Sequence, residues 1–126
     1  MARLADESEP AKPQDAGRVR CTYRWIVDSE RVLGGIALRH ELNDFLLLVG
    51  GHVGYGIRPS ARRSGLATWA LGRMLGEARA LGLDRVLITC EVDNIASAKT
   101  IEHHGGVLED LRDTELGTAR RYWIKL

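Results

Sequence analysis

The hydrophobic and polar positions of this 126-residue sequence predict a mixed α/β domain that begins with strands. Cys21–Val27 is rich in aromatic and β-branched residues and is followed by Arg31–Arg39, so the two segments predict a β-hairpin. After a loop, Phe45–Val49 and His52–Arg58 have the apolar character of further strand. Val86–Cys90 is short and almost entirely apolar, which is typical of a strand buried on both faces.

Two helices are predicted between and after these strands. From Ala67 to Leu81, apolar residues recur at intervals of three and four, which is the stripe of an amphipathic helix, and a glycine follows directly. A second helix of about ten residues starts after Asp93 or Asn94, either of which can cap it, and ends at Gly105-Gly106.

The order of the predicted elements fixes the expected topology. A strand, a helix and a second strand in succession imply a right-handed crossover and two parallel strands. Val107–Leu111 and Arg120–Leu126 predict a closing hairpin around Gly117. We therefore expect an α/β fold with one mixed sheet that is parallel in the middle and antiparallel at its flanks.

The first 18 residues differ in composition from the rest of the chain. Met1–Arg18 contains Pro10, Pro13 and Gly17 together with four acidic residues, and it has few apolar side chains to bury. Such a segment does not offset its ordering entropy, so we expect a flexible tail. Residues 19–126 then form a single domain.

Composition and charge exclude several classes of protein. The chain has 18 Lys and Arg against 17 Asp and Glu, a net charge of +1, so general attraction to nucleic acid or to an anionic membrane is not expected. No apolar run approaches the roughly 20 residues of a membrane span, and the polar N-terminus shows no secretory signal. Cys21 and Cys90 fit neither a disulfide framework nor a zinc motif. We expect a cytoplasmic protein without a metal site.

Candidate chemistry is concentrated between Arg58 and Thr68, in the loop that leads into the first predicted helix. Free backbone N–H groups at a helix N-terminus bind phosphate, and Gly65 would let the backbone approach an anion closely. Arg62 and Arg63 offer charge-assisted hydrogen bonds. The structural alternative is a basic helix entry with a surface arginine pair. Neither a P-loop nor a dinucleotide-binding glycine motif occurs in this context.

The loop and the segments after it resemble the GNAT superfamily of acyl-CoA-dependent N-acyltransferases. The family motif [QR]-x-x-G-x-[GA] is matched by Arg62, Gly65 and Ala67, after a strand that ends in Ile57-Arg58-Pro59-Ser60. Three further segments follow in the family's order: Val86–Cys90, Asn94-Ile95-Ala96-Ser97 and Gly105-Gly106. The resemblance runs from about Cys21 to Leu126 and is strongest to small bacterial members of the family.

This resemblance implies that acetyl-CoA lies where the central parallel strands splay apart, between the ends near Ile57 and Cys90. The residues implied in cofactor binding are Tyr55, Gly56, Ile57, Arg62, Arg63, Ser64, Gly65, Leu66, Ala67, Thr68, Asn94 and Ser97. It implies an N-acetyltransferase, in which an amine of a small molecule or a protein attacks the thioester directly, without a metal or a covalent enzyme intermediate. The alternative is a non-catalytic acyl-CoA-binding or interaction domain of the same fold.

Proton transfer in such a reaction needs titratable groups. Histidine titrates near neutral pH, so His52 is the first candidate base and Glu91 the second. Their structural alternatives are a histidine bonded to the backbone and a solvated carboxylate. Many family members carry a tyrosine seven residues after the asparagine as the acid for the thiolate, and here that position is Ile101. Tyr55, Tyr122 or water would then protonate the thiolate.

Members of the family usually begin with a strand and two helices that form the wall of the acceptor site. Ahead of Cys21 this sequence has only the predicted tail, so we expect those elements to be missing. Another subunit then supplies the wall, or the acceptor cleft is open and broad, or the chain binds the cofactor with little activity. We also expect a homodimer that covers the exposed sheet edges.

Overall fold

The computed structural model describes residues 2–6, 20–48, 50–62, 64–114 and 117–126. The elements in chain order are β1 (Ala2–Asp6), β2 (Cys21–Asp28), β3 (Arg31–Arg39), α1 (Asp44–Leu48), β4 (Val53–Ile57), the 3₁₀ turn η2 (Pro59–Ala61), α2 (Leu66–Ala80), β5 (Arg85–Glu91), α3 (Ile95–His103), β6 (Val107–Thr114) and β7 (Gly117–Lys125). None of the helices in these ranges is both long and apolar enough to cross a membrane.

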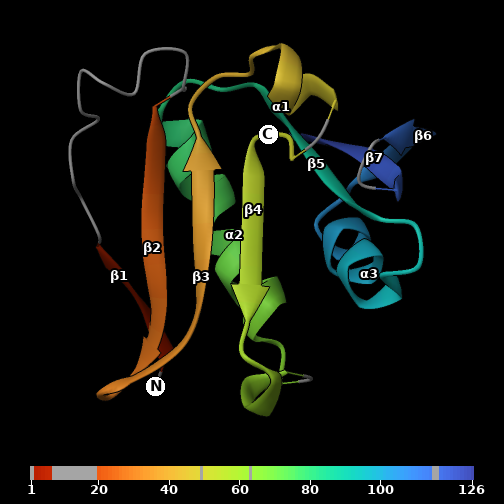
Figure 1. The fold of residues 1–126 in the computed structure, drawn as a ribbon. Coiled ribbons are helices and arrows are strands. Elements are labelled where there is room, and N and C mark those ends of the chain that lie inside the picture. Colours follow the sequence, from red (N-terminus) through yellow and green to blue (C-terminus); the bar gives the residue numbers. More distant parts are fainter. Residues whose placement is uncertain (1, 7–19, 49, 63, 115–116) are drawn as a thin grey trace.

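The strands form two sheets, one of four strands in the order β1-β2-β3-β4 and one of three in the order β5-β7-β6 (Figure 1). The predicted hairpins are confirmed as β2–β3 and β6–β7. The predicted α/β class with two main helices is confirmed as well. We also expected one mixed sheet with a parallel ladder in its middle, and this detail is not confirmed. Every ladder in the described residues is antiparallel.

The two sheets meet where β4 begins. The His52 N–H donates to the Leu87 carbonyl at 2.7 Å, and the Leu87 N–H donates to Nδ1 of the His52 ring at 2.9 Å. A single antiparallel bridge joins Gly51 to Ile88. The imidazole thus accepts the Leu87 N–H, no ladder joins β4 to β5 in the described residues, and the two strands diverge beyond this point (Figure 1).

The segment before β4 corrects one prediction. Asp44–Leu48 is helix α1, so the strand predicted over Phe45–Val49 is wrong for the residues that the structure describes. Asn43 Oδ1 accepts the Leu46 N–H at 2.8 Å, which is a typical cap at a helix N-terminus. The misassignment has a physical cause, because a short apolar run fits a buried strand and a buried helix equally well.

The predicted N-terminal tail is also corrected in part. Ala2–Asp6 is strand β1, which pairs antiparallel with β2 from Ala2 opposite Asp28 to Asp6 opposite Arg24. Leu4 packs against the hydrophobic core. A strand therefore does precede Cys21, contrary to expectation, because the free edge of β2 offers backbone partners that composition does not reveal. Residues 7–18 of the predicted tail lie outside the described residues.

The hydrophobic core lies between the four-stranded sheet and α2 and extends beneath α3. Ile36, Leu71 and Ile101 are fully buried representatives from β3, α2 and α3. The periodicity that predicted α2 is confirmed, and Gly82 follows the helix with a φ of +90°. In Figure 1, α2 lies behind β2, β3 and β4, and no helix of the described residues lies on their other side.

Helix α3 begins and ends as the sequence predicts. Asn94 Oδ1 accepts the Ser97 N–H at 3.1 Å, so Asn94 rather than Asp93 caps the helix. The chain leaves α3 through Gly105, whose φ of +86° is accessible to glycine without strain. This cap fixes Ser97 and the first turn of α3 opposite β4.

Candidate functional site

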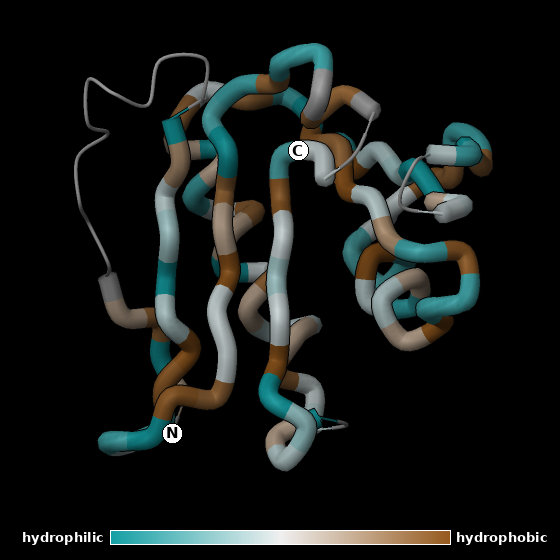
Figure 2. Tube along the Cα trace, in the orientation of Figure 1, coloured by the Kyte–Doolittle hydropathy of each residue, from teal (hydrophilic) through white to brown (hydrophobic). Residues whose placement is uncertain are grey.

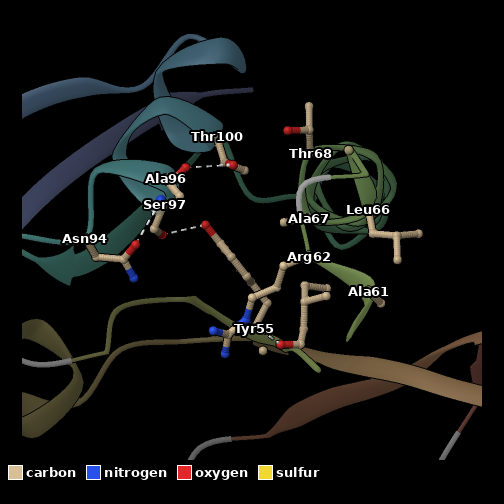
Figure 3. A pocket seen from close by; sticks show the side chains of 13 residues that line it. Tyr55, Ala61, Arg62, Leu66, Ala67, Thr68, Asn94, Ala96, Ser97 and Thr100 are labelled. Carbon is tan, nitrogen blue, oxygen red and sulfur yellow. Dashed lines mark hydrogen bonds between the residues drawn. The ribbon is translucent and has the colours of Figure 1, made fainter. Parts of the chain in front are cut away.

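A cavity of about 520 Å³ opens between β4, the start of α2 and the first turns of α3 (Figure 3). Its lining residues are Tyr55, Gly56, Ile57, Ala61, Arg62, Gly65, Leu66, Ala67, Thr68, Asn94, Ala96, Ser97 and Thr100. Ten of these thirteen are residues for which the sequence predicts cofactor binding. Strand β4, on one side of the cavity, belongs to the four-stranded sheet. Helix α3, on the other side, follows β5 of the three-stranded sheet.

The start of α2 presents backbone donors to this cavity. Gly65 is the N-cap residue, with φ +79° in the left-handed region, and its side chain position is open because a Cβ there would meet nothing within 4 Å. The first backbone bond runs from the Trp69 N–H to the Gly65 carbonyl at 3.0 Å, and no side chain of the described residues caps this end. The N–H groups of Leu66, Ala67 and Thr68 therefore have no partner within the helix. With the helix dipole, they can hold an anion.

Hydrogen bonds within the loop hold it between β4 and α2. Arg62 Nε donates to the Ile57 carbonyl at 3.0 Å, and Ser64 Oγ donates to the Ala61 carbonyl at 2.7 Å. Arg62 lines the cavity, whereas Ser64 is exposed and does not. Arg63, a further predicted phosphate contact, lies outside the described residues. Among the described residues that line the cavity, the cation is thus Arg62.

Tyr55 reaches across the cavity from β4 to α3. Its hydroxyl lies 2.6 Å from Ser97 Oγ, and Figure 3 shows the ring pointing from the strand toward the helix. Burial raises the pKa of Tyr55, an effect larger than the lowering by the Ser97 hydrogen bond. The phenol is therefore protonated near neutral pH and is able to donate a proton.

The two predicted bases do not line the cavity. His52 is buried, and its Nδ1 is occupied by the Leu87 N–H. Burial and, second, the positive charge of Arg85 lower the pKa of His52, so its ring is neutral near pH 7. Glu91 is exposed at the end of β5. This geometry supports a structural role for His52, and a role of either residue as a base stays a prediction.

Tyr55 and Tyr122, the two tyrosines predicted as possible acids, lie in different surroundings. Tyr122 is 1% exposed and donates its hydroxyl hydrogen to Glu102 Oε2 at 2.6 Å, away from the cavity. Ile101, at the position where many family members have a tyrosine, is 0% exposed and belongs to the core. Of the two tyrosines, the one that lines the cavity is Tyr55.

Three lining residues were missed by sequence reasoning: Ala61, Ala96 and Thr100. Thr100 lies three and four residues after Ser97 and Ala96, so helical spacing from Ser97 could have found it. Its hydroxyl donates to the Ala96 carbonyl at 3.0 Å. Ala61 lies in η2, which no periodicity marks. Across the described ranges, no group of three or more His, Cys, Asp or Glu is arranged to hold a metal ion.

A family model described as an acetyltransferase (GNAT) domain matches residues 4–107. This match covers all of the cavity described above. No curated protein sequence matches the chain.

Several solved structures share the fold. The microcin C7 self immunity acetyltransferase MccE, in complex with acetyl-CoA and AMP, is 19% identical with a TM-score of 0.70, over 84% of this chain and 61% of that one. The ribosomal-protein-S5-alanine acetyltransferase from Vibrio fischeri is 19% identical with a TM-score of 0.72, over 83% and 61%. Mutant forms of the spermidine/spermine N-acetyltransferase SpeG from Vibrio cholerae are 18% identical with a TM-score of 0.71, over 89% and 70%.

At these identities the likeness is one of fold. The chain spans 61% of the length of the first two structures, so they hold substantial segments that this chain does not match.

Proposed function

Because the chain belongs to the GNAT acetyltransferase family, we propose that it transfers an acetyl group from acetyl-CoA to an amine. The amine attacks the thioester directly, with both substrates bound at once, and neither a metal nor a covalent enzyme intermediate takes part. MccE, which shares the fold, is described in complex with acetyl-CoA. The acceptor is an amine of a small molecule or a protein.

The observation that carries this proposal is the set of uncapped N–H groups at the start of α2, facing a cavity bounded by β4 and α3. A diphosphate fits these donors because it is anionic and because Gly65 leaves its place free of side chain atoms. Arg62 adds a positive charge at the same place. Asn94 and Ser97 supply polar groups from α3.

The edge of β4 supports a second part of the proposal. β4 is the last strand of its sheet, so the backbone groups of Tyr55–Ile57 on its outer side form no ladder in the described residues. Such an edge pairs readily with an extended amide-containing chain, and the pantetheine arm is one. We infer that this edge positions the thioester and polarises its carbonyl.

The reaction forms a C–N bond, breaks the C–S bond, leaves a proton on the departing sulfur and removes one from the amine. We infer that Tyr55 supplies the proton to the sulfur, because its phenol is protonated near neutral pH and its hydroxyl is held 2.6 Å from Ser97 Oγ in the cavity. The amine releases its proton to solvent, and Tyr55 regains a proton from solvent, which returns the enzyme to its starting state.

Two measurements test the proposed function. Titration calorimetry with acetyl-CoA should show saturable binding, and the absence of heat and saturation into the millimolar range would remove the cofactor site. Free thiol released from acetyl-CoA is then followed with a panel of amines that includes spermidine and peptides with free N-termini. Amine-dependent release of CoA is the expected result.

A second candidate function is an acyl-CoA-binding domain without turnover. The observation that favours it is the buried Ile101 at the position of the family tyrosine, together with the absence of His52 and Glu91 from the cavity. Saturable binding of acetyl-CoA with no release of CoA to any amine would select this candidate.

A homodimer and a cytoplasmic location stay predictions. Light scattering at the assay concentration tests the first, because a monomeric mass contradicts it.

A further inference from the structure

One face of β2, β3 and β4 points away from α2, and we call it the open face. Side chains alternate along a strand, and Ile26, Ile36 and Val53 point into the core. On each strand, the positions that alternate with these core residues therefore belong to the open face. They are Cys21, Tyr23, Trp25, Gly35, Ala37, Arg39, Gly54 and Gly56. Figure 1 shows α2 behind these strands, and in Figure 2 the middle of β4 is pale, where its glycines lie.

The open face displays an aromatic pair. The rings of Tyr23 and Trp25 pack edge to face, with centroids 5.1 Å apart and an interplanar angle of 74°. Trp25 is 37% exposed although it lies on an inner strand of the sheet. Tyrosine and tryptophan are enriched at interfaces, so this pair offers a ligand an apolar contact surface with polar groups at its edge.

Two glycines, Gly35 and Gly56, lie between this aromatic pair and the edge of β4. Trp25 is opposite Gly35, which is opposite Gly56, so Trp25 lies two strand spacings, roughly 10 Å, from the edge of β4. A Cβ on Gly35 would overlap the Tyr23 hydroxyl, which places the end of that side chain directly on the glycine. A Cβ on Gly56 would meet nothing within 4 Å, so the surface beyond Tyr23 is open.

Gly56 is accessible from both faces of the sheet. It lines the cofactor cavity behind β4, and it presents no side chain to the open face. A ligand that rests on Tyr23 and Trp25 can therefore extend to the edge of β4 from the side opposite the cavity.

The charges on this face disfavour a polycationic ligand. Arg39 Nη1 donates to the Gly50 and Gly51 carbonyls, both at 3.1 Å, and its guanidinium lies beside Gly54. Neither Asp nor Glu occurs in residues 21–25, 35–39 or 53–57. A polyamine bound over these three segments would thus meet a cation and find no carboxylate within them.

We propose that the open face binds the acceptor and that the acceptor is an aromatic primary amine. Its ring packs on Tyr23 and Trp25, and its amino group reaches the thioester at the edge of β4. This inference rests on the proposed function, since it names the acceptor class for the same reaction. The neutral amine nitrogen bonds to the acetyl carbon and loses one proton to solvent, while the C–S bond breaks and CoA leaves as the thiol with the proton that Tyr55 supplies.

The test compares amines that differ in one feature. Phenethylamine, hexylamine and spermidine are supplied with saturating acetyl-CoA, and kcat/KM is measured for each. Packing against the aromatic pair should give phenethylamine a roughly five- to tenfold advantage over hexylamine. Spermidine should be the poorest of the three.

Variants locate the preference. Trp25→Ala should abolish the advantage of phenethylamine, mainly through KM, while acetyl-CoA affinity stays unchanged. Trp25→Phe keeps a ring and should keep the preference, which excludes a folding defect as the cause. Leu111→Ala is the matched control, because Leu111 is 53% exposed on β6 of the other sheet. It should change none of these values.

Three results would overturn the inference: equal kcat/KM for phenethylamine and hexylamine, a preference for spermidine, or an unchanged preference in Trp25→Ala. Failure to acetylate phenethylamine overturns it as well. If another amine of the panel is then acetylated, the proposed function stands and only the aromatic acceptor is wrong. If acetyl-CoA binds and no amine reacts, both are wrong.

Discussion

Replacing Gly65 separates the role of this residue in binding from its role in folding. Gly65 lines the cavity with a φ of +79°, and a Cβ added there meets nothing within 4 Å. Gly65→Ala therefore has two effects, backbone strain in the folded protein and a methyl group where the diphosphate is proposed to lie. Gly82→Ala has only the first effect, because Gly82 follows α2 at its other end with a φ of +90° and equally open space.

The size of each effect follows from the geometry. An alanine in the left-handed region costs about 1–2 kcal/mol, so each variant should melt roughly 4–8 °C below the wild type. Displacing the diphosphate from one N–H group removes a charge-assisted hydrogen bond of about 1.5–3 kcal/mol. The affinity for CoA should then fall at least about tenfold in Gly65→Ala, since 1.4 kcal/mol is a factor of ten.

Thermal melts and titration calorimetry with CoA measure the two effects in the same samples. Gly82→Ala should lose stability like Gly65→Ala and bind CoA like the wild type. A branched side chain fills more of the space, so Gly65→Val should remove binding altogether. Equal CoA affinity in the wild type, Gly65→Ala and Gly65→Val would refute the phosphate site at α2. Weakened binding in Gly82→Ala would show that strain alone accounts for the loss.

Three other variants probe the rest of the structure. Tyr55→Phe should lower kcat roughly hundredfold, as loss of a general acid does, with little change in acetyl-CoA affinity by calorimetry; an unchanged kcat contradicts that role. Burial and Arg85 lower the pKa of His52 in the folded protein, so the unfolded chain takes up the proton first as pH falls below about 6.5, and the free energy of unfolding decreases there. Thermal melts between pH 5 and 7.5 should show a smaller loss of stability at low pH in His52→Gln than in the wild type. The same pH dependence in both proteins would show that His52 does not cause this loss. Arg121 is 2% exposed and donates to Glu109, whose side chain is 40% exposed, at 2.9 Å. Arg121→Ala should cost about 2 kcal/mol in urea unfolding, because it removes a buried side chain together with its hydrogen bonds; a cost below about 0.5 kcal/mol would argue against this.

The elements that the sequence predicts best are those with long or paired patterns. The stripe from Ala67 to Leu81 needs only local periodicity, and α2 matches it to within one residue at each end. The hairpins β2–β3 and β6–β7 are set by short turns between neighbouring segments. The cavity follows from these elements, because the glycine loop and the cap of α3 can both be located in the sequence.

The errors concern contacts between distant segments. Strand β1 exists because β2 has a free edge, and nothing in residues 2–6 alone reveals that partner. His52 suggests a base because histidine titrates near neutral pH, yet its partner is Leu87, 35 positions later in the chain. The burial of that ring depends on this distant contact, which neither alternation nor spacing in the sequence reveals.

The position of β7 between β5 and β6 has a consequence for biosynthesis. β5 and β6 both take their sheet partners from β7, which follows both of them along the chain. A growing polypeptide on the ribosome can complete the β2–β3 hairpin and α2 early, but β5 has no neighbour in its sheet until residues beyond Gly117 have emerged. During that interval Val86, Leu87 and Ile88, which are buried in the folded protein, lack the β7 backbone partners that the complete sheet gives them.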